Sequence, residues 1–215
     1  MIDVPKFPVV IVCSPRTGST ALFKYIANKY SIIGFGEIFM NTKDLVYLNK
    51  TIYNKLLEKR KIYFDYKKSN RTDYVLKLMP KEINFFSEYE KLLQSNCFKI
   101  RLTRRSFVDQ VASMYVADKT KNFHTYLTDS PKNYEVKINK IDLLYCIEYI
   151  SNANYLVKNI KCDYDLMIDY EDLGVLPELP GNQGYTTIYH KPLNYEDIKN
   201  AIQEILHMSG TVGEI

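Results

Sequence analysis

The residues with the clearest chemical potential form a short loop near the N-terminus, S-P-R-T-G-S-T over residues 14–20. Four hydroxyl side chains and one guanidinium lie within this loop, after the apolar run VVIVC and before a helical pattern. The N-terminus of a helix carries unpaired backbone N–H groups and the positive end of a dipole, so it stabilises an anion. The loop therefore predicts an anion-binding site, whose binding residues we expect to be Ser14, Arg16, Thr17, Gly18, Ser19 and Thr20.

The loop differs at two positions from the nucleotide-kinase pattern G-x-x-x-x-G-K-[ST]. Gly18 and Thr20 fit the pattern, but Cys13 stands where the first glycine belongs and Ser19 where the lysine belongs. Without that lysine, the loop lacks the charge that such kinases place on the β- and γ-phosphates. A kinase with a divergent loop is one alternative, and an ordinary turn in which Ser or Thr caps the helix is another.

A second group of polar residues follows a predicted strand in the middle of the chain. Arg105 comes directly before Ser106, whose spacing to Asp109 is that of a helix capping box. A guanidinium can bind a phosphate through two hydrogen bonds, and Ser113 presents a hydroxyl from two turns into the helix. Taken alone, these residues are more typical of a solvated arginine pair with a helical serine that faces water. Arg104 is an alternative to Arg105 for binding a phosphate.

These segments resemble the sulfotransferases that use 3′-phosphoadenosine 5′-phosphosulfate (PAPS), nearest to their bacterial, trehalose-sulfotransferase-like and carbohydrate branch. PRTGST resembles the family's 5′-phosphosulfate loop. LTRRSFVDQVASMY resembles its 3′-phosphate motif, with Arg105 and Ser113 at the matching positions. YEDL, beginning at Tyr170, resembles a third segment that lies beside the nucleotide. The resemblance implies PAPS as cosubstrate, adenosine 3′,5′-bisphosphate (PAP) as product, and a place for Tyr170 near adenine.

The resemblance also implies a reaction: in-line transfer of the sulfuryl group to a hydroxyl of a small-molecule or carbohydrate acceptor, without a metal. Arg16 is expected to stabilise the charge on the leaving phosphate oxygen. Glu37 is the expected catalytic base, and His124 is the alternative, since phenol and steroid sulfotransferases use a histidine. The Arg-Lys-Gly motif of the cytosolic branch is absent, and we place Lys191 in its role. A catalytically inactive nucleotide-binding module is a further alternative.

Chain length, charge and the spacing of cysteine and histidine argue against several other classes of function. A chain of 215 residues, 46% hydrophobic, is long enough for one sizeable core, so we expect a single domain over residues 1–215. A net charge of +4 is too small to indicate nucleic acid. Four separated cysteines and three histidines show no metal-ligand spacing, which predicts neither a disulfide framework nor a metal site. With no leader pattern and no apolar run of ~20 residues, we expect a cytoplasmic protein without a membrane span.

Apolar patterns of strand and helix type alternate along the chain. Strands are predicted over 8–13, 31–35, 74–80 and 97–103 and in a segment ending near 169. Helices are predicted from 20, over 44–60 and 81–95, from 106, over 141–160, and after a second capping box at Asn194 and Asp197. Polar or irregular connections are predicted over 67–73, 118–139 and 174–193. This alternation is typical of an α/β fold, here a P-loop-like three-layer sandwich with a mostly parallel central sheet flanked by helices.

Overall fold

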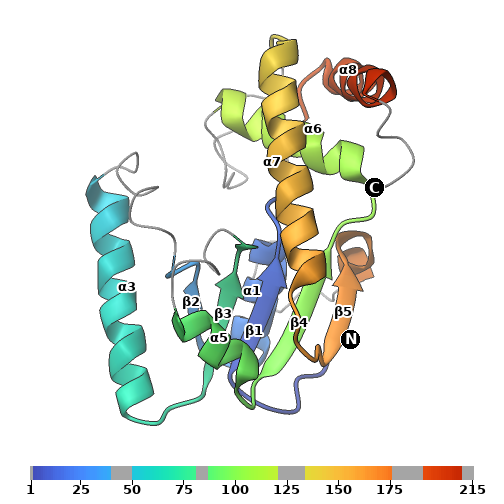
Figure 1. The fold of residues 1–215 in the computed structure, drawn as a ribbon. Coiled ribbons are helices and arrows are strands. Elements are labelled where there is room, and N and C mark those ends of the chain that lie inside the picture. The colour runs from blue at the N-terminus through green and yellow to red at the C-terminus, as the bar shows by residue number, and fades with distance from the viewer. Residues whose placement is uncertain (1, 40–49, 81–86, 121–133, 176–190, 210–215) are drawn as a thin grey trace. The chain divides into compact units, whose positions relative to one another are not determined.

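The structure, a computed structural model, describes residues 2–39, 50–80, 87–120, 134–175 and 191–209. The chain forms two compact units, each described below by itself (Figure 1). The first comprises residues 1–103 and 153–185, and the second comprises residues 104–152 and 186–215. The expectation of one domain over the whole chain stays a prediction.

The first unit is built on a five-stranded sheet in the order β2-β3-β1-β4-β5. Every pair of neighbouring strands is parallel. The predicted parallel α/β sheet is therefore confirmed, and the loop of residues 14–20 follows its central strand. The strands are β1 (Val9–Cys13), β2 (Ile33–Gly36), β3 (Tyr74–Leu78), β4 (Phe98–Thr103) and β5 (Leu166–Asp169).

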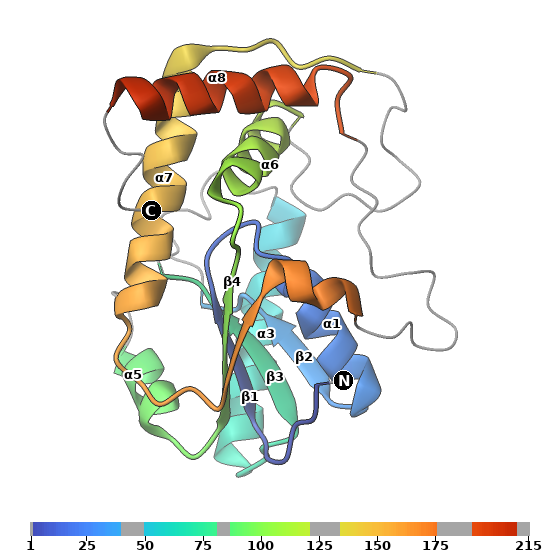
Figure 2. The same ribbon diagram turned by 90° about the vertical axis from the view of Figure 1, so that its right-hand side faces the viewer.

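Helices cover both faces of this sheet because the central strand is apolar on both sides. Alternate residues of β1 enter two different cores: Val9 and Ile11 pack with α1 (Ser19–Lys29), while Val10 and Val12 pack in the core on the opposite face. Tyr63 of α3 (Lys50–Lys68) and Tyr89 of α5 (Ser87–Gln94) belong to that opposite core. Figure 2 shows α1 and α5 on opposite sides of the strands, which gives the predicted three layers.

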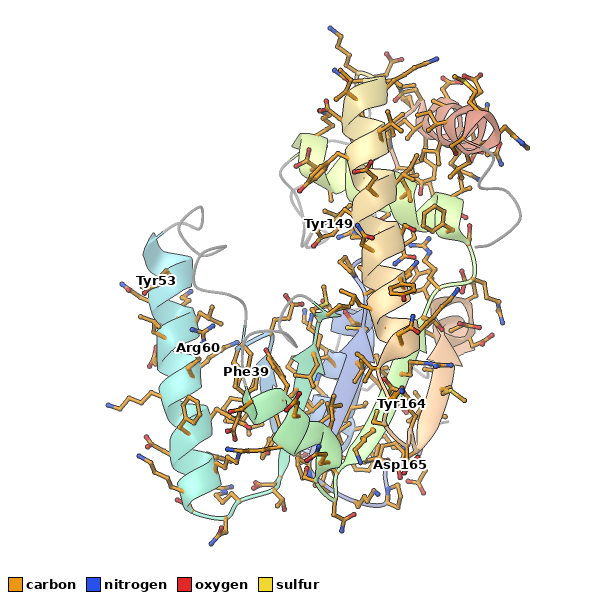
Figure 3. All side chains as sticks on the ribbon, viewed as in Figure 1. Phe39, Tyr53, Arg60, Tyr149, Tyr164 and Asp165 are labelled. Atoms are coloured by element: carbon orange, nitrogen blue, oxygen red, sulfur yellow. The ribbon has the colours of Figure 1, made fainter. Side chains whose placement is uncertain are left out.

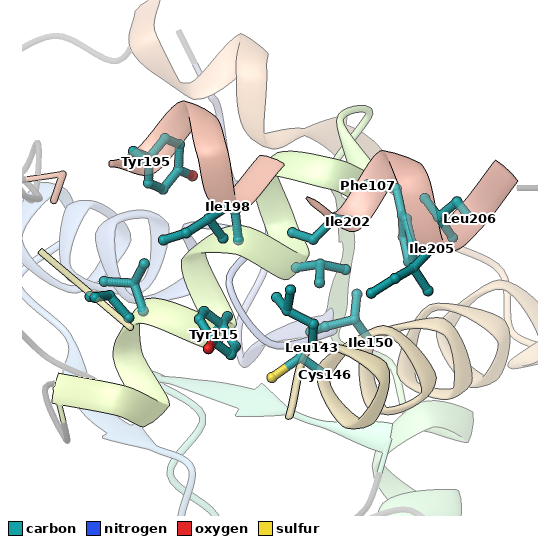
Figure 4. Packing of buried hydrophobic residues seen from close by; sticks show 14 residues of the cluster. Phe107, Tyr115, Leu143, Cys146, Ile150, Tyr195, Ile198, Ile202, Ile205 and Leu206 are labelled. Atoms are coloured by element: carbon teal, nitrogen blue, oxygen red, sulfur yellow. The ribbon is translucent and has the colours of Figure 1, made fainter. Parts of the chain in front are cut away.

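The second unit is a helical cluster with its own apolar core (Figure 4). It contains α6 (Phe107–Thr120), α8 (Tyr195–Met208) and the part of α7 (Lys140–Asn159) that precedes Ala153. Successive turns of the three helices contribute the buried side chains, as the predicted apolar stripes require. Prominent among them are Phe107, Tyr115, Leu143, Ile150, Ile198 and Ile202. None of the described helices is both long enough and apolar enough to cross a membrane.

Several boundaries differ from the sequence-based expectations. Helix α3 continues to Lys68, well past the predicted end at residue 60, because Tyr63 is fully buried and Tyr66 packs beside it. The connection predicted over 67–73 therefore begins later. Helix α6 likewise runs to Thr120, into the connection predicted from 118. The parts of the predictions that fall on residues 44–49, 81–86, 121–133 and 176–190 lie outside the described residues.

One of the two predicted capping boxes forms and the other does not. The backbone N–H of Asp109 donates to Oγ of Ser106 at 3.3 Å, as predicted. Asn194 lies at the N-cap of α8, but its side chain makes no capping hydrogen bond. Its amide instead pairs with the backbone of Val136, donating to the carbonyl at 2.8 Å and accepting from the N–H at 3.1 Å. The predicted cap at Asn194 was wrong because the side-chain amide that would form it is hydrogen-bonded to the backbone of Val136 instead.

Candidate anion-binding site

The loop after β1 has a left-handed backbone at two positions, of which only the one at Arg16 is strained. Gly18 is the N-cap of α1 with φ of 72°, and Arg16 has φ of 63°. A residue with a Cβ in this left-handed region costs about 1–2 kcal/mol, so Arg16 is held there by its surroundings. Because the N-cap is a glycine without a side chain, no Ser or Thr caps this helix. The alternative of an ordinary capped turn is therefore contradicted.

Two of the predicted hydroxyl ligands are used inside the protein. Ser14 is fully buried, and its Oγ donates to Oδ1 of Asn154 at 2.6 Å. Thr17 is also fully buried, and its Oγ1 donates to the carbonyl oxygen of Ser14 at 2.9 Å. These bonds fix the first half of the loop to α7 and to itself. Ser19 and Thr20 lie in the first turn of α1, where backbone N–H groups have no helical acceptor.

A lysine from another strand takes a place beside the loop. Lys77 lies on β3, next to Ile11 of β1 in the sheet, and is only 5% exposed. Its Nζ donates to Oγ1 of Thr20 at 3.1 Å. The loop that lacks the kinase lysine at position 19 thus has an ammonium group at its following residue. We did not identify Lys77 from the sequence, although a lysine inside the apolar strand YVLKL was an available signal, because lysine is rarely buried without a partner.

The same ammonium connects the candidate base to the loop. Glu37 follows directly after β2, and its carboxylate forms an ion pair with Lys77. The Glu37 side chain is 23% exposed, so it is accessible from solvent while remaining paired. Lys77 therefore contacts both Glu37 and Thr20. His124, the alternative base, lies outside the described residues.

Tyr170 lies against the loop glycine. It begins the 3-10 helix η1 (Tyr170–Val175), which follows β5 directly. A Cβ atom added at Gly18 would lie 2.4 Å from Cδ2 of Tyr170 and 3.1 Å from Cδ1 of Leu173. Only a glycine fits at this contact. The YEDL segment and the PRTGST loop, which are 150 positions apart in the sequence, are thus neighbours in the first unit.

The predicted residues of the 3′-phosphate motif belong to the second unit. Arg105 is exposed and Arg104 is partly buried, both just before α6, and Ser113 lies on α6 with 9% exposure. Lys191 precedes α8 and places its Nζ 4.6 Å from the ring centroid of Tyr195.

Arg104 and Lys191 act on a common carboxylate, Asp109. Burial would raise the pKa of Asp109, but the hydrogen bond from Ser106 and the nearby cations Lys199, Arg104 and Lys191 together outweigh it. The pKa of Asp109 is therefore below its ordinary value. The second unit thus holds a positively charged region that includes the alternative arginine and the predicted lysine.

Comparison with known proteins adds two likenesses of fold. No known protein family and no curated protein matches this sequence. Among solved structures, a shikimate kinase from Bacteroides thetaiotaomicron is 9% identical, with 95% of this chain and 99% of that chain covered and a TM-score of 0.44. A shikimate kinase from Acinetobacter baumannii, solved in complex with shikimate, is also 9% identical, with 98% and 97% covered and a TM-score of 0.42.

Proposed function

We propose that this protein is a sulfotransferase that moves the sulfuryl group of PAPS to a hydroxyl acceptor. One arrangement carries the proposal: the anion loop at the N-terminus of α1, with the ammonium of Lys77 at Thr20 and in an ion pair with Glu37. Fixed donors and a buried cation stabilise an oxygen that gains negative charge during a reaction. PAPS is proposed as the cosubstrate because three segments resemble the PAPS-binding segments of that family: PRTGST, the Arg105–Ser113 pair and YEDL.

The roles follow from the contacts of Lys77. In the proposed step, the acceptor oxygen bonds to sulfur while the bond between sulfur and the 5′-phosphate oxygen breaks, and PAP leaves. Glu37 receives the proton of the acceptor hydroxyl. Lys77, Arg16 and the N–H groups at the start of α1 stabilise the charge on the leaving oxygen.

The remaining proposed roles concern the nucleotide. Tyr170, which packs on Gly18, is proposed to lie beside adenine. Arg105 and Ser113 are proposed to bind the 3′-phosphate, with Arg104 as the alternative arginine. Lys191 is proposed to add a second positive charge for that phosphate, in keeping with its place beside Asp109 and Arg104.

The main rival is a nucleotide or small-molecule kinase. In P-loop kinases, the hydroxyl that corresponds to Thr20 binds Mg²⁺. Here that hydroxyl accepts a hydrogen bond from the ammonium of Lys77. The Lys77–Thr20 contact therefore favours a site that stabilises its anion with an ammonium group.

Thermal unfolding of the full chain with different nucleotides separates the two functions. We expect PAP to raise the melting temperature without Mg²⁺, because a ligand that binds only the folded state stabilises it by mass action. Adenosine 5′-monophosphate should have a smaller effect, since it lacks the 3′-phosphate. A rise with ATP and Mg²⁺ but none with PAP would show that the protein is a kinase.

A second measurement separates a working enzyme from an inactive nucleotide-binding module. Incubation with PAPS labelled with ³⁵S and a panel of sugars, phenols and lipid-linked alcohols should yield a labelled acceptor. Binding of PAP without label transfer to any acceptor would support the inactive module.

A further inference from the structure

A second cluster of positive and polar side chains lies in the first unit, on β4 and on the segment that leads into β5. Lys99 and Arg101 are alternate residues of β4, so they project from the same face of the sheet. Their neighbours on β1 are Val10 and Val12. Tyr164 packs against the core on this face, and Figure 3 labels it in the segment between α7 and β5.

Two donors of this cluster are buried without an acceptor. Among the described residues, Nε of Arg101 and the hydroxyl of Tyr164 have no hydrogen-bond partner. The guanidinium carbon of Arg101 lies 5.4 Å from the centroid of the Tyr164 ring, so both donors belong to one place. A buried polar group without a partner costs about 1–3 kcal/mol, and folded proteins rarely leave one. The Arg101 Nε–H and the Tyr164 hydroxyl therefore favour a ligand that accepts hydrogen bonds.

The cluster carries an excess of positive charge, which favours an anion as the ligand. Lys99 is only 9% exposed. Asp165 accepts a hydrogen bond from the Lys99 backbone N–H at 2.8 Å and forms an ion pair with Lys6 at 3.0 Å. The three cations Lys6, Lys99 and Arg101 therefore outnumber the two carboxylates of Asp163 and Asp165 in this cluster.

The charged groups of this cluster also affect the pKa of the Cys162 thiol. Burial raises the pKa of Cys162, whereas the nearby Tyr164 hydroxyl and Lys99 lower it, Asp163 raises it and Arg101 lowers it. The two cations and the tyrosine are therefore all within range of this one sulfur atom.

We propose that Lys99, Arg101 and Tyr164 form a second site for a small inorganic oxyanion such as sulfate or phosphate. An oxyanion accepts hydrogen bonds only, as Nε of Arg101 and the Tyr164 hydroxyl require, and the Lys99 ammonium adds charge. A bound water would satisfy a donor but would leave both positive charges uncompensated. The proposal does not depend on the sulfotransferase function, because its three residues are separate from those proposed to bind PAPS.

Binding of sulfate can be followed through the NMR signal of the Arg101 Nε–H group. In a ¹H–¹⁵N NMR spectrum of the full chain, its resonance is assigned by its absence from the Arg101→Lys variant. Sodium sulfate should shift this resonance saturably, whereas sodium chloride at the same ionic strength should not. A shift that follows ionic strength alone, or no shift, would overturn the proposal.

Variants then test the site's composition. Tyr164→Phe removes only the hydroxyl and should weaken sulfate binding at this resonance roughly tenfold, because one hydrogen bond to a charged ligand is lost. The matched control is Arg71→Met: Arg71 also stacks on a tyrosine, Tyr66, but it is paired with Asp73. Arg71→Met should leave the sulfate titration of Arg101 unchanged, and PAP binding should be unaffected by Tyr164→Phe. Unchanged sulfate affinity in Tyr164→Phe would remove the tyrosine from the site and contradict the proposal.

Discussion

The Nζ atom of Lys77 lies 3.1 Å from Oγ1 of Thr20, which joins the strand β3 to the first turn of α1. The same ammonium pairs with Glu37. A single buried cation thus contacts the anion loop and the carboxylate that we propose as the base. This contact is central to the proposed chemistry, and it gives the first prediction.

Lys77→Met keeps most of the side-chain volume and removes the charge. We expect the rate of sulfuryl transfer to fall by roughly 10²–10³-fold, as when one donor to a developing oxyanion is removed. PAP binding should weaken as well. Label transfer from PAPS and PAP titration measure the two effects.

The matched control for Lys77 is Lys67→Met. Lys67 also forms an ion pair within the first unit, but its partner is Glu88 of α5 and not a residue of the loop or Glu37. Lys67→Met should leave both transfer and PAP binding unchanged. Equal losses in the two variants would mean that Lys77 acts only through general stability.

Glu37→Gln tests the base. The amide cannot accept the acceptor's proton, so transfer should fall by roughly 10²–10⁴-fold. PAP affinity should change little, because the proposed role of Glu37 concerns the acceptor. His124→Ala is the parallel variant: if it abolishes transfer while Glu37→Gln remains active, the histidine is the base.

Arg105→Ala tests the proposed 3′-phosphate contact. Loss of a hydrogen-bonded charge pair should weaken PAP binding by at least roughly tenfold, with little change for adenosine 5′-monophosphate. Arg104→Ala, one residue earlier, is the comparison. A greater loss in Arg104→Ala would transfer the role to Arg104, and equal losses for the two nucleotides would show that neither arginine recognises the 3′-phosphate.

Gly18→Ala tests the contact between the loop and η1. The added Cβ would meet Tyr170 at 2.4 Å with φ at +72°, so we expect a loss of roughly 2–5 kcal/mol in unfolding free energy. Gly36→Ala is the matched control, because Gly36 has φ of +68° and its nearest neighbour would be 3.9 Å away. That variant should lose only the backbone cost of roughly 1–2 kcal/mol. Equal losses in denaturant titrations would deny the close packing of Tyr170.

Asp109 gives the second unit a defined pH dependence. Its folded pKa lies below the ordinary value of 3.8, so its carboxylate stabilises the folded state at every pH above 3.8. That stability is lost as the pH falls below 3.8 and through the folded pKa. Asp109→Asn should therefore melt at a lower temperature than the natural protein at pH 7, and the difference should close below about pH 3.8. A difference that stays constant down to pH 2 would contradict this account.

Local features of the molecule were predictable from the sequence. The strand, turn and helix around Gly18 follow from side-chain periodicity and from the position of a helix N-terminus. The Ser106–Asp109 cap formed because its two residues are three positions apart and depend only on the local backbone. The parallel sheet followed from the alternation of strand and helix patterns.

Contacts between distant segments were not predictable in the same way. Lys77 and Thr20 are 57 positions apart, and they meet because β3 is the neighbour of β1 in the sheet. Periodicity defines each strand but not the strand order. The same limit explains Asn194, whose amide was taken by Val136, 58 positions earlier.

The hydrogen bond between Ser14 and Asn154 spans 140 positions of the chain. A ribosome adds about 5–20 residues per second, so Asn154 is synthesised roughly 7–28 s after Ser14. A nascent chain that stops short of α7 therefore carries the glycine-containing turn without its anchor. Premature termination or a split-gene fragment in this region should yield a polypeptide that contains every residue of the motif yet fails to retain nucleotide.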